Sequence, residues 1–346
     1  MGSDPISYGF LRALLAEEDM DVRLIVTQPD RRQGKKMQES AFRALLRENG
    51  VQIEQFLPEN INRPQEEGGP DPVEKLASYE ADLFIVVAYG QFLGKRVRSL
   101  PRFGCLNMHL SLLPELRGAA PIQRAILSGA PQTGVSAMQI ARLMDGGDVY
   151  GQVAVDILPT DNHETLTDHL IAVGTPLMLE TIRALRTGTA VATPQDHSRA
   201  TEAPKLSADE WFLDWSEPAE AIDRRVRAFA PKPGCTGYLP PLNGLPPPEA
   251  LANPELLRKY WGPVLKILAV ETLSDPAPAA AMPGEIIAIE KKGVVVATGD
   301  HRAMRLVSVR PDGKPRPLDG ASFVNGYRSK LKVGDRLDPD PRSLLR

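Results

Sequence analysis

The sequence predicts an α/β fold, with a doubly wound, mostly parallel sheet in an N-terminal domain and a small β-barrel in a C-terminal domain. Apolar runs at residues 83–88 and 105–110 have the length of fully buried strands, and helical segments separate them from their neighbours. After residue 264, short β runs instead alternate directly with turns, which is typical of a small barrel. A length of 346 residues is enough for two domains that each bury a core.

Local signals define the elements of the first domain. Asp71 can cap a helix whose first residue is Pro72, and Gly50 and Gly129 suit helix ends. The expected helices cover residues 8–15, 40–49, 72–79, 119–127 and 165–187, and the expected strands cover residues 23–27, 83–88, 105–110, 134–140 and 149–157.

A polar, proline-containing segment at residues 189–206 is the expected linker between the domains. It divides the chain into a domain of residues 1–188 and a domain of residues 207–340. The second domain is expected to contain a helix at 219–229, a proline-rich irregular insertion at 240–254, and β runs at 265–270, 284–289, 293–298 and 305–309.

Three polar side chains near strand ends form the candidate site. Asn107 and His109 are two residues apart, so they share one face of the strand at residues 105–110, and Asp145 lies in a Gly-rich loop after the next strand. An α/β sheet places its chemistry outside the carboxyl ends of its strands. Each residue alone is more often structural than functional, and the combination is the specific signal. Cys105 shares the same face, but a buried thiol is normally inert.

The order of motifs resembles that of the folate-dependent formyltransferase family. Asn107-Met108-His109 is followed by the run Ser-Leu-Leu-Pro at 111–114, and an Asp-Gly-Gly loop begins at Asp145, 38 residues after Asn107. The run Arg-Gly-Ala-Ala-Pro-Ile-Gln at 117–123 resembles the branch of the family that acts on methionyl-tRNA. The run at 227–234, Arg-Ala-Phe-Ala-Pro-Lys-Pro-Gly, resembles the start of the family's C-terminal domain.

The resemblance implies a Rossmann-like first domain, an OB-like barrel and a formyl transfer reaction. The donor would be 10-formyltetrahydrofolate, a co-substrate, and the acceptor would be the α-amino group of methionine on initiator tRNA, with no metal required. Asn107 and a protonated His109 would stabilise the oxyanion, and Asp145 would set the charge of His109 and relay protons. The residues expected to hold the folate are Ser111, Leu112, Leu113 and Pro114, together with the turn Tyr89, Gly90, Gln91 and Phe92.

Basic residues indicate a nucleic-acid partner. Residues 291–336 contain eleven Lys and Arg against four acids, whereas the whole chain has a net charge of −3. A solvated surface could have the same composition. The expected tRNA contacts are Lys291, Lys292, Arg302 and Arg305 in the barrel, and Arg31, Arg32, Lys35 and Lys36 in a loop about two residues shorter than is usual in the family.

The N-terminus departs from the family pattern. In the family, the Met-Gly-Ser stretch found here at residues 1–3 lies at the end of a first strand, so that strand is expected to be missing. The first strand of a doubly wound sheet is central. Its neighbours would then lie about 9–10 Å apart, which is two strand spacings.

Composition argues against a membrane-spanning, secreted or metal-binding protein. No apolar run approaches the roughly 20 residues of a membrane span, and no secretory leader opens the chain. Cys105 and Cys235 have no metal-ligand spacing, which is typical of a reduced, cytoplasmic protein. The protein is also expected to be a monomer.

Two alternatives stay open. One is a formyltransferase acting on an amino-sugar nucleotide or glycinamide ribonucleotide, against which the basic barrel argues. The other is an inactive tRNA-binding protein, against which the intact Asn107, His109 and Asp145 argue.

Overall fold

The computed structural model describes residues 1–33, 36–64, 71–239 and 264–337, which form two compact units. The first unit contains residues 1–122, 131–157 and 166–205, and the second contains residues 123–130, 158–165 and 206–346. Residues 189–205, most of the predicted linker, belong to the first unit. There β10 (Glu202–Ala203) pairs in parallel with β7 (Arg117–Gly118).

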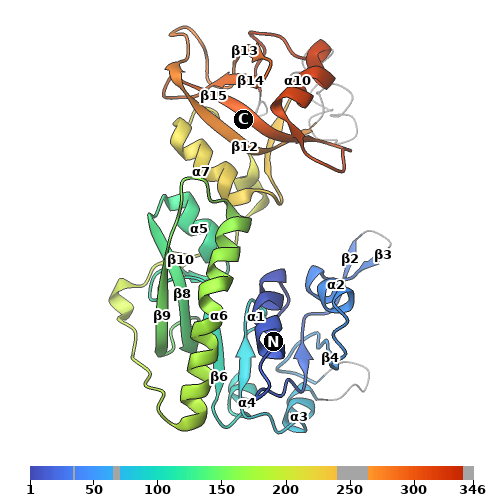
Figure 1. The fold of residues 1–346 in the computed structure, drawn as a ribbon, viewed down its shortest axis with the longest axis vertical. Helices are drawn as coiled ribbons and strands as arrows, with labels where there is room; N and C mark the ends of the chain where they lie inside the picture. The colour runs from blue at the N-terminus through green and yellow to red at the C-terminus, as the bar shows by residue number, and fades with distance from the viewer. Residues whose placement is uncertain (34–35, 65–70, 240–263, 338–346) are drawn as a thin grey trace. The chain divides into compact units, whose positions relative to one another are not determined.

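The first unit contains a two-stranded parallel sheet and a larger four-stranded sheet, besides the short β7/β10 pair and the ribbon of β2 (Arg31–Gln33) and β3 (Lys36–Gln38) (Figure 1). In the smaller sheet, β1 (Ile25–Val26) pairs in parallel with β4 (Gln55–Phe56). In the larger sheet the strand order is β5-β6-β8-β9, and its strands are β5 (Phe84–Val86), β6 (Cys105–His109), β8 (Gln132–Gln139) and β9 (Val149–Asp156). The β5/β6 pair is parallel, whereas β8 and β9 run antiparallel to their neighbours. The expected α/β architecture is confirmed, with antiparallel strands at one edge.

Helix ends follow the capping signals. The helices are α1 (Pro5–Leu15), α2 (Ala41–Glu48), α3 (Pro72–Ala77), α4 (Lys95–Arg98), α5 (Pro121–Ser128) and α6 (His163–Thr187). Asp71 accepts a hydrogen bond from the Val73 N–H, so the predicted cap of α3 is confirmed. The first helix begins earlier than predicted, because Asp4 caps it in the same way and Pro5 occupies its first position.

The predicted gap in the sheet is confirmed. Residues 1–3 lie between β1 and β5: the Gly2 N–H donates to the Val26 carbonyl at 2.9 Å, and the Val87 N–H donates to the Met1 carbonyl at 3.0 Å. β1 and β5 belong to different sheets. Apolar side chains nevertheless join the two walls in one core cluster, which includes Val26 and Val86.

A buried serine fixes the turn that follows β6. The Ser136 hydroxyl on β8 donates to the Ser111 carbonyl at 2.6 Å and accepts from the Leu113 N–H at 3.0 Å. The Gln152 amide donates to the same hydroxyl and to the Leu113 carbonyl, at 2.8 and 2.9 Å. Because Ser111, Leu113 and Ser136 are buried, each of their bonds left unmade would cost free energy. The turn therefore has one preferred conformation.

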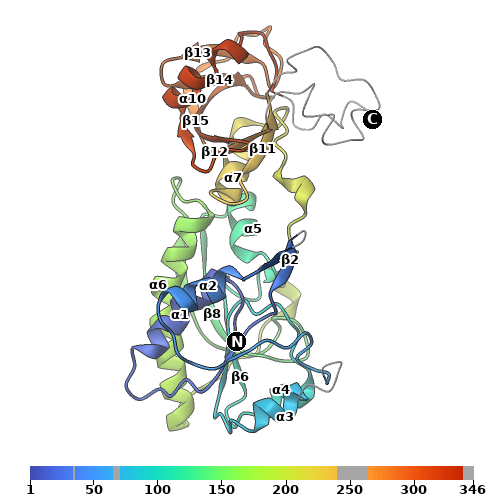
Figure 2. The same cartoon turned by 90° about the vertical axis from the view of Figure 1, so that its right-hand side faces the viewer.

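The second unit is built on a bent antiparallel sheet, as Figure 2 shows. Its strands follow the order β11-β12-β15-β14-β13, and β16 pairs with β15. The elements are α7 (Ala219–Phe229), β11 (Cys235–Tyr238), β12 (Val264–Pro276), β13 (Ile286–Glu290), β14 (Gly293–Ala297), β15 (Arg302–Pro311), β16 (Leu318–Asp319) and α10 (Gly320–Tyr327). Register shifts along the β12/β15 pair bend the sheet. The expected small β domain is confirmed, and the insertion predicted at 240–254 lies outside the described residues.

Several short elements complete the fold. The 3-10 helices are η1 (His197–Arg199), η2 (Ala208–Trp211) and η3 (Arg328–Lys330). Helix α10, which the sequence pattern did not indicate, begins after Asp319, whose carboxylate accepts from the Ser322 N–H at 2.7 Å, and it packs against β14 and β15. None of the helices in the described ranges combines the length and apolarity needed to cross a bilayer.

Candidate active site

The central strand β6 carries two of the three candidate catalytic side chains. It lies between parallel β5 and antiparallel β8, where Asn107 pairs with Val86 and Met138, and His109 pairs with Ser136. Alternation places Asn107 and His109 on one face of the strand, as predicted. Only 6% of His109 is exposed, while Asn107 is half-buried.

The backbone after β6 orients the His109 ring. Its Nε2 lies 2.9 Å from the Leu116 carbonyl oxygen, which can only accept, so Nε2 carries a hydrogen. The other ring nitrogen, Nδ1, lies 3.7 Å from Oδ2 of Asp145. That distance is too long for a hydrogen bond but close enough for an ion pair when the ring is protonated. Leu116 has a φ of 58°, an uncommon conformation for a non-glycine residue.

Asp145 is held in place from several sides. Its Oδ2 accepts the Gly118 N–H at 2.8 Å, and its backbone has a φ of 48°. The Gln195 amide donates to the carbonyls of Asp145 and Gly147, at 2.8 and 2.7 Å. A Cβ at Gly147 would lie 1.8 Å from the Gln139 carbonyl oxygen, so this position requires glycine. The loop therefore presents the carboxylate to His109 in a fixed geometry.

Gln195 belongs to a polar clamp that the sequence pattern did not reveal. Its Oε1 accepts from Nη2 of Arg117 at 2.6 Å, and the same Nη2 lies 2.9 Å from Nδ1 of His197. Gln195 is 50 residues after Asp145 in the chain and falls in the segment predicted as a linker. Neither periodicity nor motif spacing marks it. The one sequence signal near this clamp is Arg117, which begins the conspicuous run at 117–123 and donates to Gln195.

The Asn107 amide is available for a ligand. Within the described ranges no hydrogen-bond partner contacts this side chain, although it is half-buried on the strand face that carries His109. An amide N–H held in this way can donate to an oxygen that becomes negatively charged during a reaction.

Cys105, on the same strand face, is unsuited to nucleophilic chemistry. Burial raises the pKa of its thiol to about 12, and its Sγ lies 4.0 Å from the Arg98 carbonyl oxygen. The thiolate, which is the nucleophilic form, is therefore scarce near neutral pH.

The two predicted folate-binding turns follow neighbouring parallel strands, so they lie at the same edge of the sheet. In the turn at 111–114, the Ser111 hydroxyl is occupied by the Glu115 carbonyl at 2.6 Å, and Leu113 is buried. In the turn at 89–92, burial raises the pKa of Tyr89, whose hydroxyl meets no partner in the described part of the chain.

The remaining residues of the turn at 89–92 differ in what their side chains contact. Gln91 accepts from the Ile61 N–H at 2.8 Å and donates to the Pro58 carbonyl at 3.0 Å, which gives its amide a structural role. The Phe92 side chain is 52% exposed and can meet a ligand. Gly90 has a φ of 80°, a conformation that glycine adopts without strain.

The predicted basic contacts of the barrel differ in their surroundings. Lys291 and Lys292 are exposed in the turn between β13 and β14. Arg302 is 59% exposed, with its Nε 3.8 Å from Asp300. Arg305, in contrast, is only 15% exposed and forms ion pairs with Glu271 and, at 2.8 Å, with Glu290. Both terminal nitrogens of its guanidinium are engaged in these ion pairs, so we leave Arg305 out of the tRNA surface proposed below.

The predicted basic loop at residues 31–36 contains a short antiparallel ribbon. In it, β2 (Arg31–Gln33) pairs with β3 (Lys36–Gln38). Lys35 and the side chains of Arg31, Arg32 and Lys36 lie outside the described residues. Among the residues that are described, no group of His, Cys, Asp and Glu could hold a metal ion.

Comparison with solved structures identifies the fold. The structure of HypX from Aquifex aeolicus in complex with tetrahydrofolic acid matches with a TM-score of 0.58 and 17% identity, over 90% of this chain and 48% of that chain. WlaRD, a sugar 3N-formyl transferase, matches with a TM-score of 0.57 and 13% identity, over 90% of this chain and 96% of that chain. At these identities the likeness is one of fold.

Comparison of sequences identifies the family, whereas the comparison of structures identifies only the fold. The formyl transferase family profile matches residues 10–182, and the profile of the formyl transferase C-terminal domain matches residues 205–328. Proteins named methionyl-tRNA formyltransferase are 36% identical in Bacillus subtilis (97% of this chain, 96% of the relative) and 37% identical in Burkholderia pseudomallei (94% and 93%). A third, from Geobacillus thermodenitrificans, is 35% identical over 97% of this chain and 96% of the relative. The chain therefore belongs to the formyl transferase family.

Proposed function

We propose that this protein transfers the formyl group of 10-formyltetrahydrofolate to the α-amino group of methionyl-tRNA, the initiator of translation. One observation carries the proposal: relatives named methionyl-tRNA formyltransferase match 94–97% of the chain at 35–37% identity. The match includes the C-terminal domain, where the basic segment lies. In this proposal residues 1–188 catalyse the transfer, residues 207–340 bind tRNA, and the protein acts as a cytoplasmic monomer.

The site can stabilise the charge that develops during formyl transfer. The uncharged α-amino nitrogen attacks the formyl carbon, which forms the new C–N bond and places negative charge on the formyl oxygen. The Asn107 amide and a protonated His109 donate hydrogen bonds to that oxygen. Preorganised donors of this kind are each typically worth a few kcal/mol in the transition state. Since Nε2 of His109 is occupied by Leu116, Nδ1–H is the donor that remains.

Asp145 acts through His109 in this mechanism. Its carboxylate, 3.7 Å from Nδ1, stabilises the positive charge on the ring. When the oxyanion collapses, the bond between the formyl carbon and the folate nitrogen breaks. The proton released by the attacking amine passes to that nitrogen, with His109 and Asp145 as the groups able to relay it. The turns that begin at Tyr89 and Ser111 would hold the folate beside this face of the sheet.

The proposed tRNA surface includes Lys291, Lys292 and Arg302 in the second unit and Arg31, Arg32, Lys35 and Lys36 in the first. The three barrel side chains are exposed, and Lys and Arg in such positions contact phosphates. An acceptor that is a free sugar nucleotide would not need them.

Replacing the catalytic side chains tests the assignment. Asn107→Ala, His109→Ala and Asp145→Ala should each lower the turnover of methionyl-tRNA formylation by roughly a hundredfold or more, because each removes a group that acts on the transition state. Turnover would be measured with charged initiator tRNA and, in parallel, with an amino-sugar nucleotide. Cys105→Ala, on the same strand face, is the control and should stay active. A folded His109→Ala variant with near-normal turnover would disprove the role of His109, and a preference for the sugar nucleotide would disprove the proposed acceptor.

The polar clamp provides a second test. Gln195→Ala and Gln195→Glu both remove the amide donor to the Asp145 loop, and both should lower turnover by about ten- to a hundredfold, since small displacements of catalytic groups are costly. The pH dependence of turnover should change as well, because Asp145 moves relative to His109. Gln132→Ala, whose side chain is exposed on β8, should change neither property. If Gln195→Glu retained normal turnover and an unchanged pH profile, the clamp would have no role in positioning Asp145.

The salt dependence of tRNA binding tests the proposed contacts of the barrel. Changing Lys291, Lys292 and Arg302 together to Ala should raise the KM for tRNA several-fold and flatten its dependence on salt, because fewer counterions are released on binding. The KM for folate should not change. A variant with the exposed residues Arg12, Arg47 and Lys95 changed to Ala removes the same charge from the first unit. If both triple variants lost the same affinity and salt dependence, net charge and not a barrel contact would explain the binding.

A further inference from the structure

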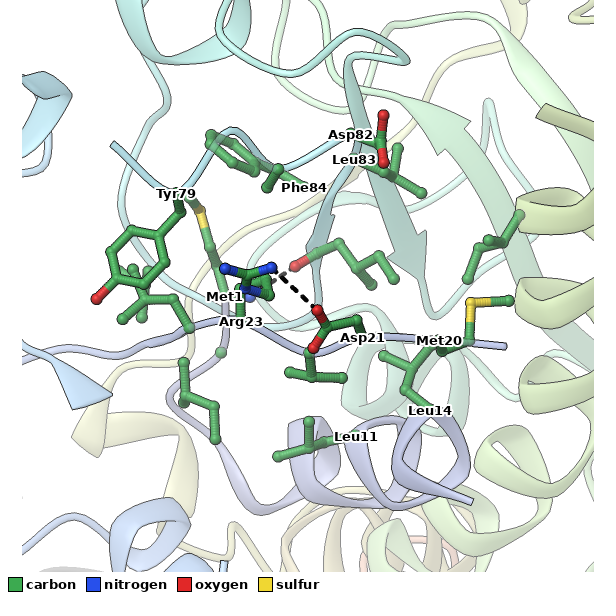
Figure 3. A pocket seen from close by; sticks show the side chains of 18 of the residues that line it. Met1, Leu11, Leu14, Met20, Asp21, Arg23, Tyr79, Asp82, Leu83 and Phe84 are labelled. Carbon is green, nitrogen blue, oxygen red and sulfur yellow. Dashed lines mark hydrogen bonds and ion pairs between the residues drawn. The ribbon is translucent and has the colours of Figure 1, made fainter. Parts of the chain in front are cut away.

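Two cavities in the described part of the first unit differ in the residues that line them. The larger, about 460 Å³, lies beside Met1, and Figure 3 shows the apolar side chains of Leu11, Leu14 and Phe84 around it. The smaller has a volume of about 360 Å³. Small-molecule sites have volumes of roughly 300–1,000 Å³. Among the described residues, the polar ones that line the smaller cavity are Ser3, Gln28, Gln38, Glu39 and Ser40. We call it the polar cavity.

The polar cavity lies next to one of the proposed folate turns. Gln28 follows the carboxyl end of β1, and the carboxyl ends of parallel strands lie at one edge of a sheet. The Ser3 hydroxyl and the Gln28 amide both donate to the Tyr89 carbonyl, at 3.1 and 2.8 Å. Tyr89 begins the turn at 89–92, so the cavity adjoins the place where the formyl donor would bind.

The polar cavity is also within reach of the catalytic strand. Residues 1–3 bridge β1 and β5, because the Gly2 N–H donates to the Val26 carbonyl and the Val87 N–H donates to the Met1 carbonyl, and β5 pairs in parallel with β6. The carboxyl ends of β1 and β6 are therefore three strand spacings apart, about 14 Å. In an aminoacyl-adenosine, about eleven covalent bonds separate the amino group of the base from the α-amino nitrogen, which gives an extended length on the order of 12 Å. The two lengths are similar.

The lining argues against a phosphate or a methionyl side chain as the occupant. None of the described residues that line the cavity is Lys or Arg, and Glu39 contributes a carboxylate that would repel a phosphate. Only Pro29 and Ala41 are apolar, so a thioether chain would bury little apolar area there. An uncharged group with many hydrogen-bonding atoms, such as a nucleoside, fits this lining better.

The segment that carries Ser40 is held in place. The Asp30 carboxylate accepts the Ser40 N–H at 3.2 Å and forms an ion pair with Arg43, in which both side chains are partly buried. Nε of Arg43 also donates to Gln55 of β4 at 3.1 Å. The cavity wall is therefore fixed to the edge of the smaller sheet, and the charge of Arg43 is already compensated.

Three side chains of the polar cavity keep hydrogen-bonding groups for a ligand. Gln38 is exposed, and its amide meets no partner within the described ranges. The Ser40 hydroxyl accepts from the Arg43 N–H at 3.2 Å, which leaves its own hydrogen to donate. The Glu39 carboxylate uses Oε2 for Arg47, which leaves Oε1 to accept. A glutamine amide can form a pair of hydrogen bonds with N6 and N7 of adenine.

We propose that the polar cavity binds the terminal adenosine of methionyl-tRNA, with the adenine base paired to the amide of Gln38 and the aminoacylated ribose directed towards β6. Ser40 and Glu39 supply a further donor and a further acceptor. Gln38 is the last residue of β3, in the ribbon whose basic residues belong to the proposed tRNA surface, so the cavity continues that surface towards the catalytic strand. This inference rests on the proposed function, because it assigns a site to one part of the same acceptor.

Trinucleotide binding tests the proposal separately from catalysis. Calorimetric titration of the full chain should show that CCA, the end of tRNA, binds at least about fivefold more tightly than CCC, as one paired contact to a base predicts. Gln38→Ala removes the amide and Ala41→Phe fills the cavity, so each should abolish this preference. Gln52→Ala and Ala77→Phe make the same changes at exposed positions outside the cavity and should keep it.

Formylation kinetics separate the failure of this inference from the failure of the proposed function. Gln38→Ala and Ala41→Phe should each raise the KM for methionyl-tRNA about fivefold or more, as the loss of one paired base contact predicts, and should leave the KM for folate unchanged. A chain that formylates methionyl-tRNA but binds CCA and CCC equally would overturn the assignment of the cavity and leave the proposed function intact. The same conclusion would follow if both variants kept the preference for CCA or the normal KM for tRNA. A chain that formylates no methionyl-tRNA would overturn the proposed function, and this assignment with it.

Discussion

The pairing of β6 with both of its neighbours is the constraint on which the site depends. Because β6 is bonded to β5 on one side and β8 on the other, its register is fixed, and a shift of one residue would turn Asn107 and His109 to the opposite face of the sheet. The same pairing brings Ser136 beside the turn after β6, where its hydroxyl holds the backbone of Ser111 and Leu113. One strand therefore positions the two proposed catalytic side chains and shapes the adjoining turn.

Asp145, the third proposed catalytic group, is positioned by different means. Asp145 is on a loop, and a loop is fixed only by bonds to something more rigid. Those bonds come from Gly118 and from Gln195, two segments that are also joined through the parallel pairing of β7 with β10. The polar stretch near residue 195 is thus part of the site and not a spacer. Its contribution is to hold a carboxylate near His109.

The sequence could predict the parts of this structure that depend on local signals. The apolar run of β6 and the cap at Asp71 were both readable because each is set by neighbouring residues. The antiparallel direction of β8, the clamp at Gln195 and the ion pairs of Arg305 with Glu271 and Glu290 were not. Each depends on which distant segments meet in space, and no periodicity or motif spacing records that.

The central claim is that Asp145 acts through the His109 ring, and a double-mutant cycle tests it most directly. The kcat/KM for methionyl-tRNA formylation would be measured for His109→Ala, Asp145→Ala and the double variant. If the carboxylate acts only by stabilising and orienting the imidazolium, the double variant should be no slower than the slower single variant. Losses that multiply in the double variant would show that the two groups act independently and would contradict this account.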